Sequence, residues 1–326
     1  MKPKVYVTRN IPKAIEMLKE HCEVTFHKNE KAPSKKEVIK NIKDKDGILC
    51  VLSDSIDGQV INSGERLKVI SSYSVGYDHI DVDAATKRGI YVTYTPEVLT
   101  ETTADLAFAL MMAVARRVVE GDELVRRGKW KDAWYYDFML GNDLHGKTLG
   151  IIGMGRIGSA LARRASGFKM KILYHNRNRL PLDREKELDV EYRGLNDLLR
   201  ESDFVSIHVS LSNDTYHMIN EKKLRLMKPN AYLINTSRGS VIDEKALAKA
   251  LKQKWIAGAA LDVFEKEPIA KDNQLLKLDN VVLVPHIGSA SRETRDKMAE
   301  VAAINLLNVL KGEKPLYLVN PEVQKL

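Results

Sequence analysis

Arg238, Glu267 and His286 are ionisable residues that each follow a short apolar run. The runs cover residues 231–235, 256–261 and 281–284. If these runs are parallel strands, the three side chains lie at the carboxyl edge of one sheet, where open α/β sheets bind ligands. Taken singly, each residue has a simpler explanation, as a charge beside a helix, a solvated loop acid or a histidine at a strand end. The three must therefore be interpreted with the rest of the chain.

A glycine-rich loop, Gly153-Met-Gly-Arg-Ile-Gly158, lies upstream of these residues, between a strand expected at 148–152 and a helix expected from Arg156. The GxGxxG spacing alone is a weak signal, but in this context it is typical of a dinucleotide site. The first glycine permits a tight turn, the second lets the backbone approach a pyrophosphate, and the third lets the helix pack on the strand. N–H groups at the helix N-terminus then bind the anion. The predicted contacts are Gly153, Met154, Gly155, Arg156, Ile157 and Gly158.

The residues after the next expected strand, at 171–175, indicate whether the dinucleotide is NAD(H) or NADP(H). Where an NAD enzyme has an acidic residue that holds the ribose 2′-OH, this chain has Asn176, followed by Arg177, Asn178 and Arg179. The two guanidinium groups could bind a 2′-phosphate through charge-assisted hydrogen bonds. The simpler alternative is an exposed turn with incidental arginines. We expect NADP(H) to be preferred and NAD(H) to be accepted, with contacts from Asn176, Arg177 and Asn178.

A dinucleotide loop followed by Arg238, Glu267 and His286 suits 2-hydroxy acid chemistry. In such chemistry the dinucleotide exchanges a hydride with the substrate carbon, and a protein acid or base exchanges the proton on oxygen. The sequence therefore favours an enzyme over a binding module.

The elements that would position these residues follow one pattern along the chain. Short apolar runs alternate with amphipathic stretches, which predicts parallel sheets covered by helices. The first series of strands is expected at 5–8, 24–26, 47–52, 67–71 and 90–93, and a second series runs from 148 to 284. A long apolar helix is expected at about 97–119, started by Thr95-Pro96, and a closing helix at about 292–311. Residues 129–146 form an irregular arm rich in aromatic residues.

Composition narrows the class of protein. A length of 326 residues suits two domains, and 44% hydrophobic with 29% charged residues excludes a mostly disordered chain. The net charge of +8 would suit a nucleic-acid-binding protein. However, the lysines near the N-terminus alternate with glutamates, which is typical of the solvent-exposed face of a helix. We therefore expect no nucleic-acid binding. No stretch approaches 18 uncharged apolar residues, so we expect no membrane binding either. Cys22 and Cys50 lie in apolar settings, which predicts two buried reduced thiols in a cytoplasmic protein.

Six segments give the chain a recognisable likeness over nearly its whole length. They are residues 74–81, 101–106, 153–158, 236–239, 262–268 and 285–289. Through them the chain resembles the D-2-hydroxyacid dehydrogenases, and most closely the glyoxylate/hydroxypyruvate reductase branch. One departure is Ser210, where this family usually has proline, and it affects only local backbone stiffness.

The resemblance implies two doubly wound, Rossmann-like lobes with the active site in the cleft between them. Residues 1–99 plus 288–326 would form a discontinuous substrate domain, and residues 100–287 the dinucleotide-binding domain. It also implies a homodimer, often with the arm at 129–146 crossing to the partner, so that Trp134 approaches the other active site.

The resemblance also assigns roles to single residues. Arg238 would bind the substrate carboxylate, His286 would act as general acid and base, and Glu267 would orient the imidazole. Further substrate contacts would come from Leu52, Val75, Gly76 and Trp134. Further cofactor contacts would come from Thr103, Thr236, Ser237, Arg238, Asp262, His286, Ile287 and Gly288. No metal site is implied.

The expected function is thus NAD(P)H-dependent reduction of glyoxylate or hydroxypyruvate to glycolate or D-glycerate. Two alternatives stay open at this point, because fold does not determine function. One is a nucleotide-sensing, corepressor-like binding protein on the same fold. The other is a related D-2-hydroxyacid dehydrogenase with another substrate.

Overall fold

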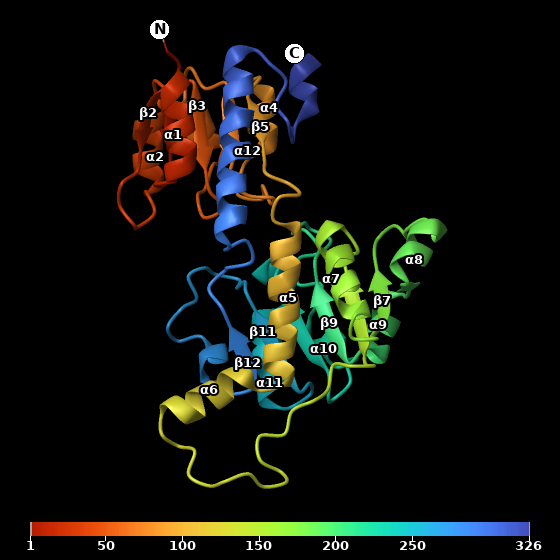
Figure 1. Ribbon diagram of the computed structural model, residues 1–326. Helices are drawn as coiled ribbons and strands as arrows, with labels where there is room; N and C mark the ends of the chain where they lie inside the picture. The colour runs from red at the N-terminus through yellow and green to blue at the C-terminus, as the bar shows by residue number, and fades with distance from the viewer. Residues whose placement is uncertain (1, 326) are drawn as a thin grey trace. The chain divides into compact units, whose positions relative to one another are not determined.

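The computed structural model describes residues 2–325, which form two compact units. Unit 1 comprises the chain up to Leu99 together with the chain from Ser289, and unit 2 comprises Thr100–Gly288 (Figure 1). Each unit contains one sheet whose named strands all pair in parallel, so the predicted fold class is confirmed. Within residues 2–325, no helix has both the length and the apolar character needed to cross a membrane.

Unit 1 has a five-stranded sheet in the order β2-β1-β3-β4-β5. Its strands are β1 (Lys4–Val7), β2 (Glu23–Phe26), β3 (Gly47–Cys50), β4 (Val69–Ser72) and β5 (Tyr91–Thr93). Its helices are α1 (Pro12–His21), α2 (Lys35–Ile42), α3 (Gly58–Ser63), α4 (Val82–Lys87) and α12 (Arg292–Lys311), with a 3₁₀ turn η3 (Pro321–Lys325). The strand order reverses between β1 and β3, which is the kind of position at which open α/β sheets bind ligands.

Unit 2 has a seven-stranded sheet in the order β12-β11-β10-β9-β6-β7-β8. Its strands are β6 (Thr148–Ile152), β7 (Lys171–His175), β8 (Glu191–Tyr192), β9 (Phe204–Ile207), β10 (Tyr232–Asn235), β11 (Gly258–Leu261) and β12 (Val281–Leu283). Its helices are α5 (Thr100–Ala115), α6 (Val118–Arg126), α7 (Arg156–Ser166), α8 (Leu182–Leu188), α9 (Leu195–Glu201), α10 (Glu221–Leu224) and α11 (Glu244–Lys252), with 3₁₀ turns η1 (Gly239–Val241) and η2 (Gln274–Lys277). This is the classic dinucleotide-binding order with one added strand, and its switch point lies between β6 and β9.

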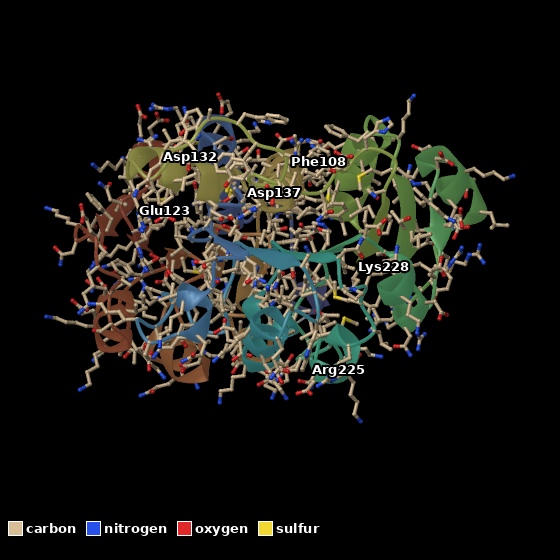
Figure 2. The ribbon with its side chains drawn as sticks, turned by 90° about the horizontal axis from the view of Figure 1, so that it is seen from below. Phe108, Glu123, Asp132, Asp137, Arg225 and Lys228 are labelled. Atoms are coloured by element: carbon tan, nitrogen blue, oxygen red, sulfur yellow. The ribbon has the colours of Figure 1, made fainter. Side chains whose placement is uncertain are left out.

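Helices cover both faces of the sheet in unit 2, which explains why its strands are continuous apolar runs. Leu149 and Ile151 of β6 belong to the core that packs under α5 and α7. Ile152 belongs to the second core, under α9 and α11. Figure 2 shows Phe108 of α5 on one side of the sheet and Arg225, at the end of α10, on the other. Because all seven strands are parallel, their carboxyl ends meet at one edge.

The helix expected at 97–119 is wrong at both ends. The structure begins α5 at Thr100, because Glu97 has φ of 73° and cannot continue a right-handed helix. It ends α5 at Ala115, and Arg117, with φ of 54°, separates it from α6. Residues other than glycine rarely take this left-handed conformation, so the sequence carries no signal for either break. The closing helix at 292–311 is confirmed as α12.

Candidate active site

His286 and Glu267 form a hydrogen-bonded pair at the carboxyl edge of unit 2. Glu267 follows β11 and His286 follows β12, and Nδ1 of His286 lies 2.7 Å from Oε2 of Glu267. The other carboxylate oxygen, Oε1, accepts a 3.0 Å hydrogen bond from the N–H of Phe264. The His286 side chain is 24% exposed and the Glu267 side chain 31% exposed, and Glu267 as a whole residue lies at the surface. The pair is therefore held in place while remaining accessible to a small molecule.

The charge of Glu267 determines which ring nitrogen of His286 carries a proton. Burial raises the pKa of Glu267, but the hydrogen bond and positive charge of His286, the N–H of Phe264 and the charge of Arg238 lower it by more. The pKa therefore lies below its usual range and the group is a carboxylate at neutral pH. A carboxylate only accepts hydrogen bonds, so Nδ1 carries a hydrogen and Nε2 is the atom left to exchange a proton.

Arg238 is presented by a short turn after β10 that Asn235 organises. The buried Asn235 side chain accepts hydrogen bonds from the N–H and the hydroxyl of Ser237, and its amide donates to the carbonyl of Arg238. Arg238 itself donates from Nη1 to the carbonyl of Ser237 at 2.9 Å. Sequence reasoning missed Asn235. The signal that could have found it is a buried amide at a strand end directly before the turn.

The turn that carries Arg238 and the loop that carries Glu267 pass very close to each other at Gly239. A Cβ atom on Gly239 would lie 1.8 Å from the carbonyl carbon of Phe264, which is backbone and cannot rotate away. Only glycine permits this approach. The contact therefore brings Arg238 beside the His286–Glu267 pair.

Gly239→Ala should accordingly reduce kcat/KM by roughly 10²-fold or more, because the two catalytic loops must separate and geometry errors near 1 Å cost about that much. Steady-state kinetics and a thermal melt measure the effect. Gly121→Ala is the matched control, since its Cβ meets only the end of Met139 at 3.8 Å. Wild-type kinetics for Gly239→Ala would contradict the assigned geometry.

Asp262 fixes the segment on which His286 lies. Its carboxylate accepts backbone N–H bonds from Ile287 at 2.6 Å and Gly288 at 2.8 Å, and its carbonyl accepts from the N–H of His286. The hydroxyl of Thr103 donates to the carbonyl of Gly288 at 3.0 Å. Burial raises the pKa of Asp262 to about 6. The structure thus brings together five of the residues expected to contact a cofactor.

The glycine loop after β6 fits a dinucleotide. Gly153 has φ of 99°, and a Cβ there would lie 2.7 Å from the backbone of His208. A Cβ on Gly158 would lie 2.3 Å from the carbonyl oxygen of Gly153, whereas above Gly155 there is open space. The backbone is therefore packed on one side and exposed at the N-terminus of α7, where a pyrophosphate would bind. The buried hydroxyl of Thr236 also has no hydrogen-bond partner among the residues that the structure describes, and a ligand would supply one.

In the turn after β7, Arg177 is available to a 2′-phosphate as expected, but Arg179 is not. Asn176 closes onto the glycine loop, its side-chain oxygen accepting a 2.6 Å bond from the N–H of Met154, so that its NH₂ group is left to donate. Arg177 is 86% exposed. Arg179, which we expected to be available to a phosphate, instead forms two 2.8 Å hydrogen bonds to Glu185. The sequence could not reveal this pair, because Glu185 lies on the next helix.

The remaining predicted substrate contacts belong to unit 1 and to the irregular arm. In unit 1, Leu52 follows β3, and Val75 and Gly76 follow β4, where the hydroxyl of Ser74 donates to the carbonyl of Gly76 at 2.6 Å. In unit 2, Trp134 is 82% exposed in the irregular arm. The substrate contacts of these four residues stay predictions.

Comparison with known proteins identifies the family. Residues 108–288 match the D-isomer specific 2-hydroxyacid dehydrogenase, NAD binding domain. The chain belongs to this family. The match covers the glycine loop, the Asn235 turn and the His286–Glu267 pair, and it shows that unit 2 binds a nicotinamide dinucleotide.

Several known proteins are similar to this chain over nearly its whole length. A glyoxylate reductase of Korarchaeum cryptofilum is 60% identical over 326 residues, covering 100% of this chain and 98% of that protein. A crystal structure from Thermus thermophilus is 47% identical with a TM-score of 0.91, covering 97% of this chain and 99% of that one. The NADPH-dependent glyoxylate/hydroxypyruvate reductase of Sinorhizobium meliloti, solved with NADP and malonate, is 33% identical with a TM-score of 0.88, covering 99% and 98%.

Proposed function

We propose that the protein reduces a small 2-oxo acid, glyoxylate or hydroxypyruvate, to glycolate or D-glycerate with NAD(P)H. The observation that carries this proposal is the His286–Glu267 pair, 2.7 Å apart and beside Arg238 in a dinucleotide-binding unit. The names of the relatives support the substrate class. Unit 1 is the proposed substrate domain and unit 2 the dinucleotide-binding domain.

The mechanism follows from the chemistry of these groups. When bound, the reduced nicotinamide supplies a hydride. Arg238 holds the substrate carboxylate through its planar fork of N–H donors and polarises the adjacent carbonyl. His286 gives the proton on Nε2 to the carbonyl oxygen, and Glu267 stabilises the imidazolium form from the Nδ1 side. In the reverse direction Nε2 takes the proton back.

Further contacts are proposed for residues on both units. The backbone N–H groups of Val75 and Gly76 bind the substrate carboxylate, and Leu52 and Trp134 contribute apolar substrate contacts. The cofactor contacts are the glycine loop 153–158, the turn 176–178, and Thr103, Thr236, Ser237, Asp262, Ile287 and Gly288.

A substrate panel tests the substrate class. We expect kcat/KM to be highest for glyoxylate or hydroxypyruvate, lower for pyruvate and lowest for phenylpyruvate. The measurement is initial rate against concentration for each acid at saturating cofactor. A highest kcat/KM for phenylpyruvate would contradict the proposed substrate class.

We further propose that NADP(H) is preferred over NAD(H). Asn176 removes the charge that would repel a 2′-phosphate, and its NH₂ group is positioned as a donor. Arg177 is exposed and pairs only loosely with Asp214, at 3.8 Å with both side chains at least 80% exposed. A charge-assisted hydrogen bond contributes about 1.5–3 kcal/mol when partly desolvated, so even one shifts the preference roughly tenfold.

The double variant Asn176→Asp with Arg177→Ala should therefore shift the ratio of kcat/KM values toward NADH by roughly tenfold or more. Asp restores the repulsive charge, and Ala removes the guanidinium. Arg184→Ala is a suitable control, since this arginine pairs with Glu187 on the exposed side of α8. An unchanged ratio in the double variant would show that this turn does not read the phosphate.

We also propose a cytoplasmic homodimer. Two free buried thiols, Cys22 and Cys50, support a reducing compartment. The large apolar side chains exposed on α6 and the arm support a protein interface there. They are Val118, Val119, Val125, Trp130, Trp134, Tyr135, Tyr136 and Leu140.

Light scattering at micromolar concentration should give twice the 36.8 kDa mass of the chain. The reason is that so many exposed apolar side chains on one segment are unusual for a monomer. Replacing Trp134 and Tyr136 by serine should weaken the dimer, and Leu316→Ser, on unit 1, is the control. A monomer mass for the wild type would refute the proposal.

A further inference from the structure

The turn after β7 is held by a closed network that no catalytic role explains. Arg179 donates from Nε and Nη2 to the two oxygens of Glu185, each at 2.8 Å. The hydroxyl of Tyr174, on β7, donates to the same carboxylate at 2.5 Å and accepts the N–H of Leu180 at 2.9 Å. The turn is thus tied at both ends to Glu185 on α8.

Glu185 is ionised throughout the physiological range. The hydrogen bonds from Arg179 and Tyr174 lower its pKa to about 2, against the effect of burial. Only 7% of the residue is exposed, so water solvates its charge poorly and the guanidinium is its main compensation. Because the pairing is bidentate, the Nε–Nη2 edge of the Arg179 guanidinium is occupied and its positive charge is compensated.

Arg179 is also restrained by an aromatic ring. Its guanidinium lies 5.6 Å from the centre of the Tyr192 ring on β8. Arg177, two residues earlier, is held more loosely, since among residues 2–325 its ion-pair partner is Asp214, which is 3.8 Å away and 80% exposed. The two arginines therefore differ in what they offer to a ligand, although their spacing suggests equivalent roles.

We propose that Glu185 is a specificity-determining residue that neutralises Arg179, so that Arg177 alone supplies the guanidinium that reads the 2′-phosphate. This inference rests on the proposed preference for NADP(H). The added claim is that the preference for NADP(H) over NAD(H) is smaller than the turn could give, because the Arg179 guanidinium is kept in an ion pair with Glu185. Removing the charge of Glu185 releases Arg179 and increases the preference.

The experiment measures dissociation constants of NADP⁺ and NAD⁺ by titration calorimetry without any 2-oxo acid, so that its result is independent of catalysis. The variants are Glu185→Gln, Arg179→Ala and the double variant Arg179→Ala with Glu185→Gln. For each, the quantity compared with wild type is the ratio of the NAD⁺ constant to the NADP⁺ constant.

Glu185→Gln should raise this ratio by about threefold or more, the scale of one partly exposed charge pair. Arg179→Ala should lower it, because the uncompensated Glu185 carboxylate repels the phosphate. The double variant should return it to within about twofold of wild type, because a neutral pair has been replaced by neutral groups.

Two results would overturn the proposal. If Arg179 contacts the phosphate directly, the double variant keeps the low ratio of Arg179→Ala. If Glu185 has no influence on specificity, Glu185→Gln leaves the ratio unchanged. Should the double variant fail to fold by circular dichroism, the conservative Glu185→Gln decides the matter alone. A wild-type ratio near one would refute the NADP(H) preference itself, and 2-oxo acid turnover would still report separately on the enzyme assignment.

Discussion

His286→Asn should lower kcat for 2-oxo acid reduction by roughly 10²–10⁴-fold, the usual contribution of a positioned general acid. The imidazole is set up for this task by Glu267, which fixes Nδ1–H at 2.7 Å and leaves Nε2 to deliver the proton. Asparagine is the appropriate replacement because His286 has φ of 53°, a conformation that asparagine tolerates well. The variant removes the exchangeable proton and keeps the backbone.

The measurement is kcat at saturating substrate, with the NADP⁺ dissociation constant as the folding and cofactor control. We expect the dissociation constant to stay within about threefold of wild type, because the glycine loop and α7 supply most of the dinucleotide contacts. Turnover close to wild type would remove His286 from the mechanism.

Arg238→Lys should lower kcat/KM by roughly 10²-fold or more. Lysine keeps the positive charge but cannot donate two parallel hydrogen bonds to a carboxylate, and each such bond contributes about 1.5–3 kcal/mol. The loss should lie mainly in kcat/KM for the 2-oxo acid and not in dinucleotide binding.

A rescue experiment separates the lost fork from a general distortion of the turn. Added guanidinium ion should restore part of the activity of Arg238→Ala and none of the activity of His286→Asn. If Arg238→Lys matches wild type in kcat/KM, charge alone suffices and the bidentate grip is not used.

The strand ends were the part of the site most accessible to sequence reasoning. The runs before Arg238 and Glu267 are buried on both faces, so their continuous apolar character shows directly in the sequence. The run before His286 is an edge strand in which only Val282 is buried, but its residues are also all apolar. The glycine loop was equally visible, because Gly153 and Gly158 permit close backbone approaches and Gly155 leaves open space where a pyrophosphate would bind.

Features that depend on tertiary contact were not predictable. Asn235 acts by organising the turn that carries Arg238. An asparagine at this position permits such a turn but does not require it. Glu185 lies nine residues after Asn176 and reaches Arg179 only once α8 packs beside β7, so the arginine appeared available in the sequence. Local propensity likewise does not encode the left-handed conformations of Glu97, which precedes α5, and of Arg117, which separates α5 from α6.

The most direct test of the central claim, reduction of a small 2-oxo acid with a nicotinamide cofactor, follows NADPH absorbance after glyoxylate or hydroxypyruvate is added to the purified protein. Our account predicts a steady loss of absorbance with wild type and almost none with His286→Asn. No loss with any 2-oxo acid, under conditions where calorimetry shows that the cofactor binds, would contradict it.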